Sequence, residues 1–145
     1  ESTPQLAANV GLSYRSNNNI FLSADFNYYN NMYLSMSPIY RTDAVITTGM
    51  TAEDIAHLRR QEKFDSAYTL NASIGKNWYI HRQYTLGFSL EVKNILNNQD
   101  IRTGGYEQTR LTKNTETTVT TYQAFDSKYF YMFGTTYYLN LYFRF

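Results

Sequence analysis

Apolar and polar residues alternate along five stretches of this chain. In residues 6–14, leucine, alanine, valine, leucine and tyrosine occupy the even positions, and small or polar residues occupy the odd ones between them. Because successive side chains of a β-strand point to opposite faces, this alternation predicts strands with one apolar face and one polar face. The apolar row falls on even numbers in the first four stretches and on odd numbers in the last. The predicted strands cover residues 6–14, 20 to about 29, 64–79, 84 to about 95 and 128–145.

The last stretch, residues 128–145, is longer than an ordinary strand, which has about 5–6 residues. Its apolar row is aromatic at both ends, and the opposite row includes Gly134, Thr136, Asn140 and Arg144. Such a pattern is typical of a strand that crosses a bilayer in a closed barrel. We therefore expect an all-β fold, an antiparallel transmembrane β-barrel.

The connections between the predicted strands alternate in length. Residues 15–19 and 80–83 form short polar turns, whereas residues 30–63 and 97–126 form long connections. Outer-membrane barrels have short periplasmic turns and long extracellular loops. This rule predicts a location in the cell outer membrane, with the long connections outside and the carboxy terminus at the periplasmic side.

The two long connections carry local patterns of their own. Thr51 and Asp54 have the spacing of a capping box, which predicts a short helix over residues 51–61. The threonine-rich run over residues 109–121 is a candidate extension of a β-ribbon beyond the membrane.

Five strands are too few to close a barrel. Bacterial barrels have an even number of strands, at least about eight, and unpaired strand edges are costly in lipid. Residues 1–145 are therefore expected to form the carboxy-terminal portion, the last five strands, of a larger barrel. The chain starts at Glu1 without the charged and apolar regions of a signal peptide, so we expect either that such a peptide has been removed or that this is a segment of a longer chain.

The amino-acid composition favours some classes of function and argues against others. The chain has 15 tyrosines and 9 phenylalanines, which the aromatic belts of a membrane barrel would use. It has no cysteine, which excludes a disulfide scaffold and thiolate chemistry. A formal net charge of +1 argues against nucleic-acid binding through phosphate contacts.

The carboxy-terminal end resembles the assembly signal of outer-membrane β-barrels, a final phenylalanine preceded by apolar residues at alternating positions. The resemblance implies recognition by the barrel-assembly machinery and contact with outer-membrane lipid. The residues of this candidate assembly signal are Tyr137, Leu139, Leu141, Phe143 and Phe145.

Further stretches resemble the TonB-dependent outer-membrane transporters of Bacteroidota. Residues 91–97 (EVKNILN) are similar to a V-x-N-L-x-N stretch near the end of that family. The other similar stretches are residues 27–33 with Ser37, Pro38 and Arg41, residues 104–108, and residues 128–131. The resemblance implies a barrel of about 22 strands that imports a nutrient such as a glycan, peptide or metal chelate. It also implies a plug domain, contact with TonB and a SusD-like surface lipoprotein as partners.

The sequence offers no catalytic constellation, so we expect no enzyme, no metal site and no cofactor. His57 and His81 are isolated, and a solvated surface position is the ordinary state of such residues. Glu53, Asp54 and Glu62 lack the loop spacing of a calcium site.

Two groups of residues are candidates for solute contact. Asp25, Glu91 and Lys93 lie on the polar rows, where we favour ion pairing with the plug or neighbouring strands over solute contact. Loops on a rigid scaffold often carry binding residues. The candidates for extracellular ligand or partner contact in the second long connection are Tyr106, Arg110 and Tyr122.

Three other classes fit parts of the pattern. A complete small outer-membrane barrel with a structural or adhesion role would need extra strands in the long connections, which lack further alternating apolar rows. A membrane protease or acyltransferase would need paired acids with a histidine or serine at the rim. A soluble lipid-binding barrel would leave the aromatic belts unexplained.

Overall fold

The computed structural model describes residues 3–42, 50–81, 83–113 and 120–145. This part of the chain is mostly antiparallel β-sheet with few helices. The chain divides into two compact units. The sheet unit comprises Gln5–Asn30, Ser66–Ile101 and Met132–Phe145, and the ribbon unit comprises Glu1–Pro4, Asn31–Asp65 and Arg102–Tyr131. Across the described ranges, no helix has the length and apolar character needed to cross a membrane.

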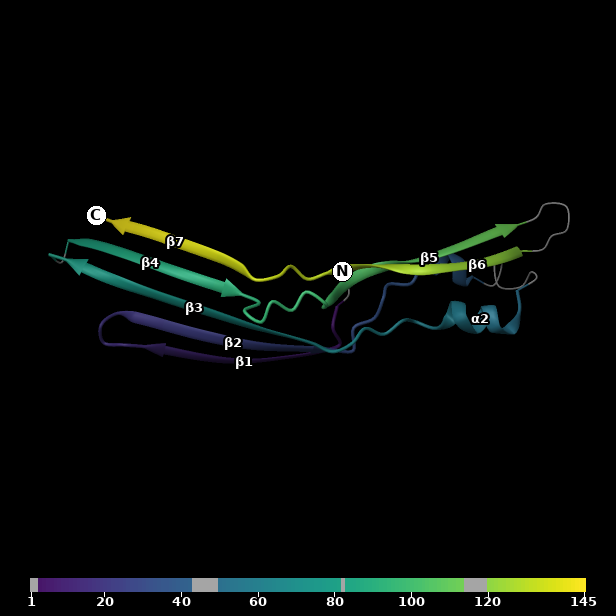
Figure 1. The fold of residues 1–145 in the computed structure, drawn as a ribbon, viewed down its shortest axis with the longest axis horizontal. Helices are drawn as coiled ribbons and strands as arrows, with labels where there is room; N and C mark the ends of the chain where they lie inside the picture. The colour runs from purple at the N-terminus through teal and green to yellow at the C-terminus, as the bar shows by residue number, and fades with distance from the viewer. Residues whose placement is uncertain (1–2, 43–49, 82, 114–119) are drawn as a thin grey trace. The chain divides into compact units, whose positions relative to one another are not determined.

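The sheet unit is a single antiparallel sheet of five strands (Figure 1). Its strands follow the order β1-β2-β3-β4-β7, so each strand pairs with its neighbours in that order. The all-β antiparallel fold predicted from the alternating residues is confirmed. The strands are β1 (Leu6–Arg15), β2 (Ile20–Asn30), β3 (Ala67–Ile80), β4 (Tyr84–Lys93) and β7 (Thr136–Arg144).

The predicted final strand over residues 128–145 is wrong in its extent, because the structure has two strands there. Strand β6 (Thr120–Tyr131) belongs to the ribbon unit, and β7 begins only at Thr136. Between them the Thr135 amide donates to Asn97 Oδ1 (3.1 Å), and the Thr135 hydroxyl donates to the Asn94 carbonyl (2.8 Å). These bonds replace ladder bonds and end the strand, although the alternation of side chains runs on.

The second long connection contains a β-ribbon. Strand β5 (Arg102–Lys113) pairs with β6 in a two-stranded antiparallel sheet of its own. The ribbon anticipated for the threonine-rich run is therefore confirmed. It starts earlier and ends later than expected, with twelve residues in each strand.

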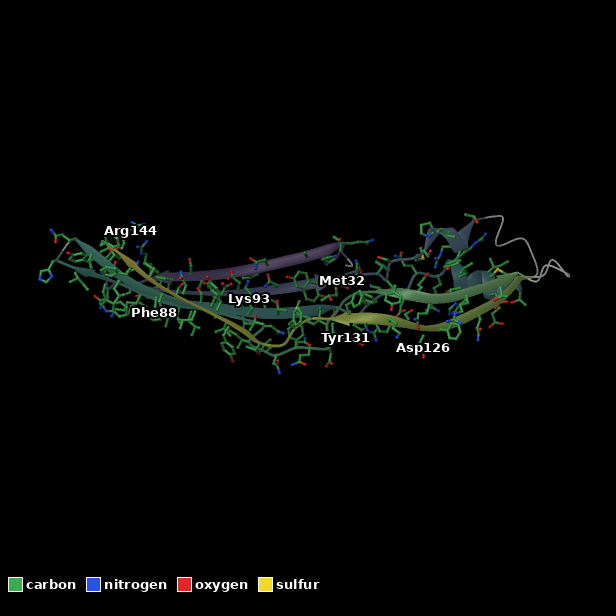
Figure 2. All side chains as sticks on the ribbon, turned by 90° about the horizontal axis from the view of Figure 1, so that it is seen from above. Met32, Phe88, Lys93, Asp126, Tyr131 and Arg144 are labelled. Atoms are coloured by element: carbon green, nitrogen blue, oxygen red, sulfur yellow. The ribbon has the colours of Figure 1, made fainter. Side chains whose placement is uncertain are left out.

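The register of the sheet unit places the predicted apolar rows on one face. Directly opposed residues of an antiparallel pair share a face, and Leu12, Ala24, Ala72, Val92 and Tyr137 are opposed in sequence across all five strands. Even positions of β1 to β4 and odd positions of β7 thus lie together, as the alternation predicted. Figure 2 shows side chains projecting from both sides of this sheet, with Phe88 and Arg144 labelled on opposite sides.

The opposite face of the sheet is polar and hydrogen-bonded across strands. The Ser23 and Ser73 hydroxyls of β2 and β3 share a hydrogen bond of 2.8 Å. Asn27 accepts from Asn9 Nδ2 (2.8 Å) and donates to Thr69 Oγ1 (3.3 Å). Such cross-strand pairs fix the register of the sheet.

The ribbon unit has a small core of its own. A 3₁₀ turn, η1 (Pro38–Arg41), and one helix, α2 (Ala52–Arg59), accompany the ribbon. The helix confirms the predicted capping box, in which the Thr51 hydroxyl accepts from the Asp54 amide and the Asp54 carboxylate accepts from the Thr51 amide. It ends at Arg59, two residues before the predicted end. The buried apolar residues of this unit are Met32, Leu34, Leu58 and Phe64.

Candidate functional site

The apolar face of the sheet unit exposes many large hydrophobic side chains. Several of its side chains are more than half exposed, including Leu12 (75%), Leu141 (70%) and Tyr137 (73%). Soluble monomers rarely expose contiguous apolar patches beyond a few hundred Å². A covering layer of some kind, protein or lipid, is therefore required by this face.

Aromatic residues of the apolar face gather towards its two ends. Between them lie mainly aliphatic residues such as Leu12, Leu22, Ile74, Leu90 and Leu139. We call the two groups the loop-side belt and the turn-side belt. The loop-side belt comprises Phe26, Tyr28, Tyr68 and Tyr137, and the turn-side belt comprises Tyr14, Trp78, Tyr84, Phe88 and Phe143.

The loop-side belt slants across the sheet. In β2 and β3, Tyr28 is opposite Tyr68, close to the long connections. In β7, Tyr137 is opposite Val92, which is itself opposite Ala72. Going from β2 to β7, the belt has therefore moved along the strands towards the short turns.

The turn-side belt slants in the same direction. Tyr14 of β1 is opposite Leu22, which pairs with Ile74. Phe143 of β7 is opposite Leu86, which pairs with Trp78, nearer to the short turns. Aromatic belts that shift along the strands in the same direction across a sheet are expected when strands are tilted between two flat interfaces, as barrel closure requires.

On β3 the two belts also have about the separation of a bilayer band. On β3, Tyr68 and Trp78 lie ten positions apart, about 33 Å along a strand at roughly 3.3 Å per residue. With a tilt of about 45°, this corresponds to about 23 Å along the barrel axis, close to the apolar band of about 25 Å in outer-membrane barrels.

The acids and lysine singled out on the polar rows lie on the polar face. Lys93 Nζ is 3.5 Å from Glu91 Oε1, and both side chains are largely exposed. This ion pair lies within one strand, whereas ion pairing with the plug or with neighbouring strands was expected for these residues. Asp25 lies against Gly11, because a Cβ atom on Gly11 would be only 2.7 Å from its Oδ1.

The stretch that carries the family resemblance forms an amide network at the end of β4. Asn94 is buried, has a positive φ of 51°, and donates from Nδ2 to the carbonyls of Asn98 and Phe133, both at 3.0 Å. Its Oδ1 accepts from the Asn98 amide (3.1 Å), and its own amide donates to Asn71 Oδ1 (3.0 Å). Residues 91–97 therefore have a structural role, holding together the points where the chain leaves β4 and returns to β7.

The ribbon unit contains a cavity of about 470 Å³. Its lining includes Leu34, Arg41, Leu58, Glu62, Glu107 and Tyr129. At one wall, Arg41 Nη2 is 2.6 Å from Glu107 Oε1, in a pair whose side chains are only 14% and 17% exposed. Because Glu107 belongs to β5, this ion pair holds η1 against the ribbon. Arg41 also donates to the Ser37 carbonyl at the start of η1 (2.7 Å).

A second charged cluster in the cavity wall centres on Glu62. Its Oε1 accepts from the Tyr129 hydroxyl (2.7 Å) and lies 3.5 Å from Arg102 Nη1. The Arg102 guanidinium stacks 4.3 Å from the centroid of the Tyr129 ring. The hydrogen bond to Glu62 raises the pKa of Tyr129, and burial adds to the effect. Tyr129 therefore stays a neutral hydrogen-bond donor at physiological pH.

Of the three residues predicted to contact a ligand or partner, Tyr106 and Arg110 pack against different aromatic rings of the ribbon. Tyr106 is half-exposed and packs on Phe130, with 6.2 Å between ring centroids. Arg110 lies over the Phe125 ring at 5.2 Å. In the backbone register of the ribbon, Arg110 is opposite Gln123, and Tyr122 is opposite Leu111. The side chain of Tyr122 is outside the described residues.

The remaining candidate residues give no site. His57 lies at the cavity wall, and His81 lies in the turn after β3 with a φ of 51°. Where the structure describes the chain, no group of three or more histidine, aspartate or glutamate residues could hold a metal ion. The cavity thus offers paired charges and hydrogen-bonding groups.

Searches of protein-family models, of curated proteins and of solved structures find no match to this chain.

Sequence reasoning missed the charged clusters of the ribbon unit. Tyr129 and Arg102 are 67 and 40 positions from Glu62, and Arg41 is 66 positions from Glu107. No local spacing could have paired them. The Asn94 network did leave a signal, because an asparagine-rich stretch directly after a strand is typical of a turn in which side chains bond the backbone.

Proposed function

We propose that the sheet unit is part of the wall of a transmembrane β-barrel in an outer membrane, with its apolar face against lipid. The observation that carries the proposal is the pair of slanted aromatic belts with an aliphatic zone between them. A covering protein layer would need an apolar face, but it would not need aromatic belts at both ends of that face with an aliphatic zone between them. Tilted strands between two headgroup layers account for both properties.

The edges of the sheet support a barrel larger than this sheet. Within the described residues, β1 pairs only with β2 and β7 pairs only with β4. Each strand therefore presents a row of unpaired backbone groups, which costs several kcal/mol per group in hydrocarbon. Further strands on both sides would complete the ring.

The more specific proposal is a TonB-dependent transporter that imports a nutrient. It rests on the resemblance of residues 91–97 and the other quoted stretches to that family. The ribbon unit would then lie on the extracellular side, because it follows the ends of β2 and β4 that are opposite to the short turns. Plug, TonB and a SusD-like lipoprotein would be the partners, and Tyr137, Leu139, Leu141, Phe143 and Phe145 would serve the barrel-assembly machinery.

Single-cysteine variants test the lipid-facing assignment directly, since the chain has no cysteine of its own. Cysteines at Leu12, Leu90 and Leu139 should react with a lipid-soluble pyrene maleimide in intact membranes and resist a charged maleimide. Cysteines at Ser13, Glu91 and Asn140 are the matched controls on the polar face. They should not react with the lipid-soluble reagent.

The labelling pattern has a clear negative outcome. If the two rows react alike with the lipid-soluble reagent, the apolar face is not in contact with lipid. If the protein leaves the membrane fraction on alkaline washing, the face is covered by protein and the barrel proposal fails. For the transporter proposal, the check is loss of solute-dependent growth when the protein is deleted.

A further inference from the structure

A single charged side chain interrupts the apolar face. Lys76 of β3 lies between Ile20 of β2 and Phe88 of β4 in the register, with Ile74 and Trp78 beside it on the same face. Among the described residues of this face, no other side chain is charged at neutral pH. A lysine costs roughly 2–4 kcal/mol at the midplane of a bilayer and about 0–1 kcal/mol near the interfaces. The free-energy cost of Lys76 therefore depends on its depth in the bilayer.

Lys76 lies at the level of the turn-side belt. Trp78, two positions further along the strand, and Phe88, its register neighbour, both belong to that belt. Belt residues sit at the headgroup level of a barrel in a membrane. A long lysine side chain directed along the strand reaches the same level.

The Lys76 ammonium has an aromatic neighbour but no acid. Its Nζ atom is 5.3 Å from the centroid of the Trp78 ring, which in turn is 5.8 Å from the Phe88 ring. None of the ion pairs found among the described residues includes it. On the opposite face, by contrast, Lys93 is 3.5 Å from Glu91. The positive charge on the apolar face is thus left for an anion from outside the described chain.

We propose that Lys76 and Trp78 form a binding site for the phosphate group of a glycerophospholipid, in the leaflet on the side of the short turns. This proposal rests on the proposed lipid-facing position of the sheet. Phosphate is the anion that a bilayer supplies at headgroup depth. The Lys76 ammonium gives a charge-assisted hydrogen bond to it. The Trp78 indole N–H, for which the described residues provide no acceptor, gives a second donor.

The apolar neighbours of Lys76 favour a lipid phosphate over a protein carboxylate as its partner. Ile20 and Phe88 flank the lysine on the neighbouring strands, so an acyl chain can lie along apolar side chains while its phosphate meets the ammonium. The cation–π contact with Trp78 orients the ammonium without neutralising its charge. A second copy of the chain could not neutralise it either, because its matching face carries the same lysine and no acid among the described residues.

The experiment uses the whole membrane protein, purified in a mild non-ionic detergent and delipidated. Native mass spectrometry follows the binding of dioleoylphosphatidylglycerol and of dioleoylglycerol, which lacks the phosphate. Lys76→Gln should weaken the tightest phosphatidylglycerol site on the order of tenfold, the size of one charge-assisted hydrogen bond. Binding of dioleoylglycerol should not change. Lys76→Arg should retain most of the affinity, and Trp78→Phe should weaken it less than Lys76→Gln.

Lys93→Gln is the matched control, because it removes a lysine from the polar face of the adjacent strand. It should leave the tightest site unchanged. Equal phosphatidylglycerol binding by wild type and Lys76→Gln would overturn the proposal, as would an equal loss in Lys93→Gln. Heat-dependent gel mobility verifies that each variant is a folded barrel. A protein that needs no detergent to stay in solution would instead contradict the proposed function itself.

Discussion

At the scale of single residues, the polar face of the sheet depends on two glycines that aromatic rings cover. The Phe21 ring lies over Gly75, and the Tyr142 ring lies over Gly87, so that a Cβ atom at either glycine would overlap the ring. The Tyr142 hydroxyl reaches further and donates to Asn77 Oδ1. A ring placed over a strand glycine restores the packing that the missing side chain would otherwise have provided.

Gly87→Ala should therefore destabilise the sheet by about 1–3 kcal/mol, because the Tyr142 ring must leave its position. The measurement is the temperature at which the purified protein loses its folded gel mobility. Ser89→Ala, two positions along the same row of β4, is the control and should change this temperature little. Equal shifts for the two variants would show that the ring contact does not stabilise the sheet.

Leu139 and Asn140 give a sharper test of the two faces. Leu139 is opposite Leu90, between the belts, whereas Asn140 is opposite Ser89 on the polar face. Leu139→Arg should cost about 2–4 kcal/mol if the face meets lipid near the midplane, and Asn140→Arg should cost clearly less. Unfolding in urea from lipid vesicles measures both. Similar losses would contradict the assignment.

Tyr129 and Glu62 give a prediction for pH. Because the Tyr129 pKa is raised, its contribution to stability is fully present below its unfolded value of about 10 and is lost as pH rises through the folded value. Glu62→Gln should move the Tyr129 pKa back towards about 10. Carbon-13 NMR of the labelled tyrosine Cζ atom measures this pKa. An unchanged value in the variant would show that Glu62 is not the cause.

At the scale of elements, the alternation of side chains was sufficient to identify the strands of the sheet and their shared face. It could not locate the break between β6 and β7, because the period continues from Tyr129 to Phe143 while hydrogen bonds to Thr135 change the backbone. It also missed most of β5, whose start at Arg102 lacks an apolar row. Hydrogen-bond partners on neighbouring segments decide where such strands begin and end. The residue type at a single position does not reveal these partners.

The Asn94 network should be the main determinant of this boundary. Asn94→Ala removes side-chain bonds to Asn98 and Phe133 and places alanine at a positive φ. We expect a loss of about 2–4 kcal/mol and faster chymotrypsin cleavage at Phe133, which is 84% exposed. Asn98→Ala is the control, since only the backbone of Asn98 joins the network. Cleavage at the wild-type rate in Asn94→Ala would contradict this role.

At the scale of the whole molecule, the chain divides into the sheet unit and the ribbon unit, and each contains a β-sheet of its own. Replacing residues 109–121 by a tight turn should therefore leave the sheet folded, because the described residues of this range pair within the ribbon. Folded gel mobility should stay at the wild-type level. Solute uptake or co-purification of a surface lipoprotein should fall if the ribbon contacts either one. Normal values of both would make the ribbon a connector only.

The Asn94 side chain has a consequence for how such a protein can diversify. It binds the carbonyl of Asn98, where the chain departs, and that of Phe133, where the chain returns. These two hydrogen bonds thus fix the position of β7 locally, whatever the number of residues between Asn98 and Phe133. We therefore expect that the intervening segment can be exchanged for one of another length without disturbing the sheet. An engineer could do the same, using the position as a graft site for a foreign epitope.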